Sequence, residues 1–372
     1  MNFFYWFWAF CIVAGILYSA LIIWFLNGWR NIPFFKRKNN IYKTKISVIV
    51  PFYNEQKNIE NCINGLIYQD IKTTELEIIL IDDKSTDKSA DITKKYAEQY
   101  RRIKYILNTG HKGKKHALLK GISESKGDLI ITTDADCSYN KHWLANIVEY
   151  YETYNPNMIT GAVKLQTNKS IFQQFQQIEF MSLVATGAGA VGINHPVMCN
   201  GANLAFKKNV FSELKDPYNI KYESGDDVFL LHNFKNIDAE KIHFLKNKES
   251  IVVTQASSGI KQFFKQRFRW VSKATGYTDS DTKFTGLIVF LSTLLWITGL
   301  FLIPYKIDFW QPTLFLFSIR IIINIVFLNN ISGFFSTKIP NLLIPVFEIF
   351  YGIYVSTTIF HLFFNKKTGK TE

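Results

Sequence analysis

The chain has 372 residues, enough for one large domain or two smaller ones, and it carries 43 Lys and Arg against 30 Asp and Glu, a formal net charge of +13. A basic balance suits nucleic acid, an anionic membrane surface or phosphorylated ligands. The aromatic residues crowd into the two ends of the chain, which favours a membrane over nucleic acid. The four cysteines are scattered without a C-x-x-C pair, so neither a disulfide framework nor a zinc site is indicated.

The first predicted element is a membrane-spanning helix, and we assign residues 1–28 to it. Residues 3–26 form an uncharged run rich in Phe, Trp, Ile and Leu, long enough to cross a hydrocarbon core of about 30 Å. A cleaved signal peptide fits poorly, because no basic residue precedes the run. Several Lys and Arg residues follow it directly. By the positive-inside rule, we expect the N-terminus outside and the following chain in the cytoplasm.

Strand and helix patterns alternate through the next region, residues 43–258. Short apolar runs at 46–50, 76–81, 103–107 and 130–133 predict buried strands, with amphipathic helices between them. The series predicts an open α/β sheet with ligands at the carboxyl ends of its strands. Because no G-x-G-x-x-G follows any strand, a dinucleotide-binding domain is disfavoured.

Acidic pairs stand at two of these strand ends. Asp134 and Asp136 follow the last strand and are spaced i, i+2, which puts both carboxylates on one side of an extended backbone. Such a pair suits Mg²⁺ or Mn²⁺ and leaves open positions for substrate phosphates. The alternative is an ordinary Asp-rich turn. Asp82 and Asp83 end the strand at 76–81.

Seven motifs in chain order resemble family 2 glycosyltransferases. They are Val50 to Glu55, Ile81 to Asp87, Gly113 to Leu118, Asp134-Ala135-Asp136, Cys199 to Phe206, Gly225-Asp226-Asp227 and Gln266 to Trp270. The last motif, Q-x-x-R-W followed by membrane segments, resembles the membrane-integrated branch. The resemblance implies a GT-A fold, an open and mostly parallel sheet with helices on both faces. It also implies inverting transfer of a sugar from a nucleotide-diphospho-sugar.

The resemblance assigns a donor side to the first motifs. Asp82 and Asp83 would hydrogen-bond the nucleobase and ribose, since carboxylates accept from imide N–H and hydroxyl groups. Pro51 and Glu55 would complete the nucleoside pocket, and Lys114 would meet the nucleotide or a phosphate. The metal would offset charge on the leaving nucleoside diphosphate. Helix-capping acids and a solvated charge run are the alternatives for these groups.

The later motifs would form the acceptor side. Gly201 and Asn203 are expected to line the acceptor or donor-sugar pocket. Asp227, beside Asp226, occupies the position of the general base that takes the proton of the acceptor hydroxyl. We expect desolvation beside a second acid to raise the pKa of Asp227. The alternative is an acid pair at a helix N-terminus.

Residues 259–283 form a basic, aromatic segment that we expect at the membrane interface. Helical spacing places Gln266, Arg269 and Trp270 on one face. Arginine suits bidentate contact with a diphosphate, and an indole face suits stacking against a sugar. The alternative is a purely interfacial amphipathic helix with an anchoring Trp.

Residues 284–364 form a C-terminal membrane region of about three apolar segments, at 284–303, 314–328 and 342–364. Arg320 lies inside the second segment, so it should face the protein interior, pair with another group or snorkel. Four crossings would put the tail outside, but three lysines after the last segment argue for inside. One segment is therefore a candidate for a re-entrant or interfacial helix.

These patterns predict an integral protein of the inner or plasma membrane with a cytoplasmic catalytic domain. We expect a glycosyltransferase that moves a hexose from a nucleotide-diphospho-sugar, with UDP-sugars favoured, to a lipid-linked or glycan acceptor. Mg²⁺ or Mn²⁺ would be the cofactor, membrane lipids would be partners, and nucleic acid would not. A processive polysaccharide synthase that exports its polymer is the alternative. A non-catalytic membrane scaffold or transport protein is a more remote one.

Overall fold

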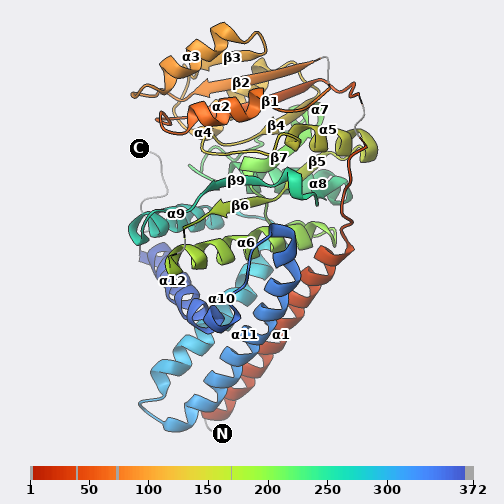
Figure 1. Ribbon diagram of the computed structural model, residues 1–372. Coiled ribbons are helices and arrows are strands. Elements are labelled where there is room, and N and C mark those ends of the chain that lie inside the picture. The colour runs from red at the N-terminus through yellow and green to blue at the C-terminus, as the bar shows by residue number, and fades with distance from the viewer. Residues whose placement is uncertain (1–2, 39–40, 73–74, 169, 365–372) are drawn as a thin grey trace.

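The computed structural model describes residues 3–38, 41–72, 75–168 and 170–364, the last six of them by their backbone alone. Figure 1 shows a layered α/β part above a slanted bundle of long helices. Helices α6 (Ile171–Val191) and α9 (Ile260–Ser272) lie between these two parts.

The central sheet has seven strands in the order β3-β2-β1-β4-β7-β5-β8. All neighbouring pairs are parallel except those of β7, which runs antiparallel to both β4 and β5. The strands are β1 Ile46–Phe52, β2 Leu76–Asp82, β3 Ile103–Leu107, β4 Leu129–Thr132, β5 Met158–Gly161, β7 Leu204–Lys207 and β8 Ile242–Leu245. A second sheet pairs β6 (Val163–Gln166) with β9 (Val252–Gln255).

Helices cover both faces of the sheet, which explains why its strands are apolar throughout. Ile49 of β1 belongs to a cluster with Leu118 of α4, whereas its neighbours Val48 and Val50 pack in a second cluster with Ile63 of α2. Strand residues alternate between faces, so a strand buried on both needs a continuous apolar run. The predicted mixed, mostly parallel α/β fold is confirmed. The helices here are α2 Ile59–Ile67, α3 Ser89–Gln99, α4 Lys114–Glu124, α5 Trp143–Tyr154, α7 Lys208–Ser212 and α8 Asp226–Asp238.

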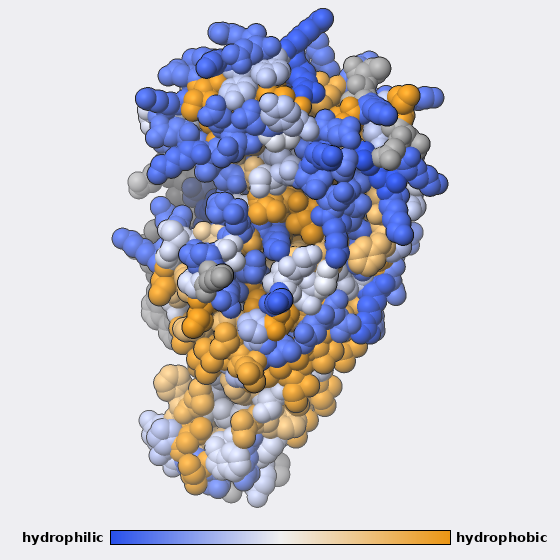
Figure 2. Space-filling view, viewed as in Figure 1, coloured by the Kyte–Doolittle hydropathy of each residue, from blue (hydrophilic) through white to orange (hydrophobic). Residues whose placement is uncertain are grey.

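The lower part is built from α1 (Phe3–Asn31), α10 (Ser280–Leu302), α11 (Trp310–Phe335) and α12 (Ile344–Phe364). Among the described residues, three helical stretches are long and apolar enough to cross a membrane: α1, α10 and residues 307–335. Figure 2 shows the matching surface, with apolar residues concentrated over the bundle and hydrophilic residues over the sheet part. The prediction of apolar helices at both ends is confirmed, although α12 is not among these three.

α12 turns back toward the α/β part. Its Glu348 pairs with α11, while the hydroxyl of Tyr354 donates to Glu179 on α6, and the Tyr354 ring packs on Phe263 of α9. Figure 1 shows its later turns close to α9. α12 thus packs against α6 and α9 as well as against α11.

A polar cluster holds the bundle together. Arg320 is fully buried, its Nε donates to Glu348 Oε1 at 2.6 Å, and its guanidinium lies 4.2 Å from the ring centre of Tyr18 on α1. The amide of Asn324 donates from Nδ2 to Glu348 Oε2, and its Oδ1 accepts from the Tyr18 hydroxyl. The expectation that Arg320 faces the interior and finds a partner is therefore confirmed.

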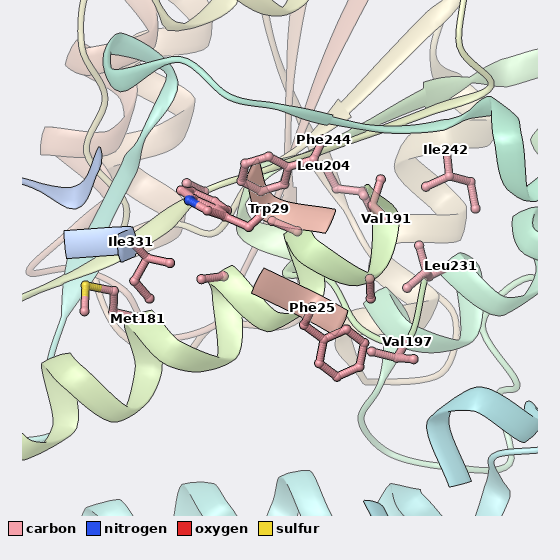
Figure 3. Close-up of a cluster of buried hydrophobic side chains, with 14 of the residues drawn as sticks. Phe25, Trp29, Met181, Val191, Val197, Leu204, Leu231, Ile242, Phe244 and Ile331 are labelled. Carbon is pink, nitrogen blue, oxygen red and sulfur yellow. The ribbon is translucent and has the colours of Figure 1, made fainter. Parts of the chain in front are cut away.

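One apolar core joins the bundle to the sheet part. Phe25 and Trp29 of α1 belong to the same buried cluster as Leu204 of β7 and Phe244 of β8, and Figure 3 shows these side chains gathered beside α6. A Cβ on Gly189 of α6 would lie only 2.1 Å from the carbonyl oxygen of Phe25, so the two backbones approach more closely than any larger residue allows. This contact fixes α1 against the α/β part.

Candidate active site

A cavity of about 780 Å³ extends from the carboxyl end of β4 into the helix bundle. Its polar end is lined by Lys114, Asp134, Asp136, Asp226, Asp227 and Lys273. Its other end is lined by bundle residues that include Tyr18, Phe25, Val289, Phe327, Phe347 and Tyr351. One space is therefore charged near the strand ends and largely apolar between the helices.

Asp134 and Asp136 follow β4, and both line this cavity. Asp134 Oδ1 lies 2.6 Å from Lys114 Nζ, and Asp136 Oδ2 accepts a hydrogen bond from Thr254 Oγ1 at 2.8 Å. Glu55 is close by: burial raises its pKa, and the two aspartates raise it further. Asp134 already pairs with a positively charged ammonium. The carboxylate oxygens of Asp134 and Asp136 are therefore suited to a hard divalent cation.

The metal-binding fit has a limit. In the described part of the chain, no group of three or more His, Cys, Asp or Glu side chains is arranged to hold a metal ion. Two carboxylates alone leave an octahedral ion with most of its positions to fill. Diphosphate oxygens and water are the ligands that would complete the shell.

Asp227 lies in the first turn of α8 and faces two lysines. Its Oδ1 accepts from the backbone N–H of Val228 at 2.8 Å and lies 3.3 Å from Lys273 Nζ. Burial alone would raise the pKa of Asp227, but Lys273 and Lys114 outweigh it, so the pKa is lowered. Our expectation of a raised pKa is therefore wrong, since it considered the neighbouring acid and not the lysines.

Gly225 makes the turn that brings the acids to the cavity. Its φ of 89° lies in the left-handed region, which glycine adopts without a steric cost. A Cβ here would lie 2.7 Å from Lys273 Cδ. Glycine thus permits both the turn before Asp226 and the approach of Lys273 to Asp227.

Of the predicted donor-side residues, Lys114 lines this cavity. The described lining of the cavity does not include Pro51, Glu55, Asp82 or Asp83. Pro51 is buried within β1. Asp82 accepts from Ser85 N and from the Tyr105 hydroxyl. Asp83 accepts from Asn108 Nδ2 at 2.7 Å and from Gly113 N at 2.8 Å. Asp83 therefore anchors the loop that leads to Lys114.

Gly201 and Asn203 differ in where they point. Gly201 lines the cavity, and a Cβ on it would lie 3.2 Å from Asp226 Oδ2. Asn203 is buried: its amide nitrogen donates to the carbonyls of Ala162 and Ser250, and its Oδ1 accepts from Trp143 Nε1. The structure therefore does not bring the Asn203 side chain into the cavity, because three internal partners hold it in the core.

Gln266, Arg269 and Trp270 of α9 all line the cavity, as their shared helix face predicts. Between them in sequence, Arg267 is buried and forms an ion pair with Glu179 of α6. The Arg267 guanidinium lies 4.1 Å from the ring centre of Trp270. The indole is thus held by a cation that is itself fixed to a second helix.

Sequence reasoning missed Lys273, Arg267 and Glu179 as members of the site. Lys273 and Arg267 lie within residues 259–283, which the sequence describes only as a basic, aromatic segment at the membrane interface. Glu179 lies in an amphipathic-looking segment without a motif. The sequence signal for Glu179 is a single acid in an otherwise uncharged helix. A buried acid needs a partner, so it indicates a pairing with a basic residue.

Residues 47–214 match the family model of Glycosyl transferase family 2. Glycosyltransferase AglE of Haloferax volcanii is 28% identical over 119 residues, which cover 32% of this chain and 39% of that protein. Probable glycosyltransferase YdaM of Bacillus subtilis is 38% identical over 111 residues, 29% of this chain and 26% of that protein. The matched relatives are glycosyltransferases. The chain thus spans well under half the length of these two curated relatives.

A longer match is the dolichyl N-acetyl-alpha-D-glucosaminyl phosphate 3-beta-D-2,3-diacetamido-2,3-dideoxy-beta-D-glucuronosyltransferase of Methanococcus voltae. It is 24% identical over 272 residues, 70% of this chain and 84% of that protein. Among solved structures, the mannosyltransferase PcManGT from Pyrobaculum calidifontis, in complex with GDP-Man and Mn²⁺, aligns over 95% of both chains. Its TM-score is 0.53 at 16% identity, which supports the GT-A fold.

Proposed function

We propose that this protein is a membrane-bound inverting glycosyltransferase that moves a sugar from a nucleotide-diphospho-sugar to a hydroxyl of a lipid-linked acceptor. The observation that carries the proposal is the single cavity that joins the carboxylates after β4 and at the start of α8 to the apolar interior of the bundle. A water-soluble donor suits the polar end. A lipid-linked acceptor suits the other end, because its chain can lie among the bundle helices while its sugar reaches Asp227.

In this proposal the polar cluster has two tasks, to deprotonate the acceptor and to stabilise the leaving group. Asp227 accepts the proton of the acceptor hydroxyl as its oxygen attacks the anomeric carbon. Lys273 and Lys114 keep Asp227 ionised, as a base must be. Asp134 and Asp136 would hold Mg²⁺ or Mn²⁺, which supplies charge neutralisation for the leaving nucleoside diphosphate.

The remaining cavity residues orient the acceptor. Trp270 offers an indole face for a sugar ring, and Arg267 with Glu179 fixes its position. Arg269 and Gln266 offer donors toward the same space. Asp82 and Asp83 stay our proposed nucleoside contacts, because a carboxylate oxygen that accepts one hydrogen bond retains a second lone pair.

The relatives support a lipid-linked acceptor. The Methanococcus voltae protein is named for a dolichyl sugar phosphate, and a further relative from Pyrococcus furiosus is named dolichol-phosphate mannosyltransferase, at 31% identity over 28% of this chain. Both acceptors named there are polyprenyl phosphates or their sugar derivatives. A lipid carrier of that class matches the apolar end of the cavity.

The bundle interior favours single transfer over the processive alternative. The sequence offers four polar residues for a polymer channel: Arg320, Asn324, Glu348 and His361. The first three bond to one another instead, and the side chain of His361 lies outside the described residues. Arg320 is fully buried between the helices. A channel there would have to break this cluster.

We further propose that the catalytic domain faces the cytoplasm and that the tail lies on the same side. Basic residues flank the domain at both membrane boundaries, which supports the first point. Three crossings by α1, α10 and α11, with α12 returning to α6 and α9, support the second. The tail lysines lie outside the described residues, but their positive charge agrees with this side.

The test is transfer by the full-length protein in lipid nanodiscs. Radiolabelled UDP- and GDP-sugars are offered with Mn²⁺ and a polyprenyl-phosphate-linked sugar, and the organic phase is analysed for product length and anomeric configuration. One added sugar of inverted configuration is expected. A ladder of products would establish the processive alternative, and a retained configuration would overturn the role of Asp227. Label that never enters the lipid fraction with any donor would overturn the proposal.

A further inference from the structure

Lys114 occupies the centre of the polar cluster. It is the first residue of α4, and its Nζ lies 2.6 Å from Asp134 Oδ1 and 3.3 Å from Asp226 Oδ2. Gly201 lies against both side chains: a Cβ on it would be 3.2 Å from Asp226 Oδ2 and 3.8 Å from Lys114 Nζ. The ammonium thus bridges a proposed metal ligand and the acid next to the proposed base.

The bridging ammonium is positively charged at neutral pH, as a lysine between two carboxylates is expected to be. A protonated ammonium donates hydrogens to the same carboxylate oxygen that a divalent cation needs. Two cations cannot share that oxygen at close range without strong repulsion in a partly buried site.

We propose that Lys114 competes with the divalent cation for Asp134, so that the cation binds tightly only together with a diphosphate. Lysine has a flexible stem and three rotatable donors, so its ammonium can leave Asp134 for a nearby phosphate oxygen. The diphosphate supplies the anionic oxygens that Lys114 loses, and it also completes the coordination shell. This inference deepens the proposed function, on which it rests.

The proposal implies a coupling between metal and nucleotide that a variant can remove. Mn²⁺ binding is measured by electron paramagnetic resonance on purified full-length protein in detergent, without nucleotide and with UDP or GDP. The wild-type protein should bind Mn²⁺ weakly alone and more tightly with one of the nucleotides. Lys114→Met should tighten binding without nucleotide by about tenfold, a typical coupling between linked sites. The enhancement by nucleotide should shrink correspondingly.

Lys112→Met is the matched control. Lys112 belongs to the same loop, but its Nζ lies over the ring of Tyr53, 3.7 Å from the centre. The Lys112→Met substitution removes the same charge but leaves the ion pair of Lys114 with Asp134 in place. Lys114→Arg keeps the charge and should bind Mn²⁺ as the wild type does, which separates the loss of the charge from the loss of the lysine side chain.

Several results would overturn the competition. One is equal Mn²⁺ affinity of Lys114→Met and the wild type without nucleotide. Another is equal tightening by Lys112→Met, since that would show a general effect of charge. Absence of Mn²⁺ binding in every protein with either nucleotide would also overturn it. Sugar transfer in the same preparation tests the proposed function separately, so the two failures are distinguishable.

Discussion

Replacing Lys273 by Met should move the acid limb of the pH–rate profile to higher pH. Lys273 is the largest favourable influence on the ionised form of Asp227 and lowers the pKa of that carboxyl below its ordinary value of 3.8. A general base works only when deprotonated. The wild type should therefore stay active well into acid, whereas loss of the lysine raises the pKa of Asp227 and the variant should lose activity at a higher pH.

The size of the shift follows from the separation of 3.3 Å between Lys273 Nζ and Asp227 Oδ1. Two unit charges about 4 Å apart interact by about 1 kcal/mol in water and about 4 kcal/mol at an effective dielectric constant of 20. Removing Lys273 should therefore destabilise the ionised form of Asp227 by an energy within this range, which raises the pKa of the carboxyl.

The assay is kcat/KM between pH 4.5 and 8, which reports the free enzyme. The wild type should transfer sugar almost as fast at pH 5 as at pH 7, and Lys273→Met should slow markedly over that interval. Lys265→Met, at an exposed position of α9, is the control with the same change of charge. Superimposable profiles for Lys273→Met and the wild type would show that Asp227 is not the titrating base.

Three further substitutions test other parts of the site and the bundle. Asp227→Asn should lower kcat by about 10²- to 10⁴-fold while nucleotide-sugar binding persists in a thermal-shift assay, and near-normal turnover would remove Asp227 as the base. Asp136→Ala should weaken Mn²⁺-dependent binding of the donor, so an unchanged Mn²⁺ dependence would exclude it as a ligand. Glu348→Ala leaves Arg320 buried without its carboxylate and should cost about 3–5 kcal/mol of unfolding free energy in detergent. Replacing both Glu348 and Arg320 by Met should recover most of that loss, and an equal or larger loss in the double variant would contradict the reasoning.

The first four strands could be predicted from the sequence because parallel strands buried on both faces leave continuous apolar runs. The predicted strand at 103–107 coincides with β3, and the strands at 46–50 and 76–81 differ from β1 and β2 by one or two residues at their ends. The acids at those ends mark where each strand leaves the core. The position of Asp134 at the carboxyl end of β4 followed from that pattern.

The later part of the chain was less predictable, because its partners are distant in sequence. β7 has four residues and inserts antiparallel between β4 and β5, which no local pattern indicates. Asn203 looked like a pocket residue, but Trp143, on another element, fixes it in the core. Lys273 meets Asp227 across 46 residues, and only the folded chain brings them together.

The buried pair of Arg320 and Glu348 has a consequence for biogenesis. The two charges lie on different helices, α11 and α12, and both are buried. On the translocon scale, an arginine at the centre of an isolated apolar helix costs about 2.5–3.5 kcal/mol. In the membrane-bound protein that we propose, α11 is therefore expected to insert stably only with α12 in place. A chain that ends before α12 would leave Arg320 without its carboxylate partner.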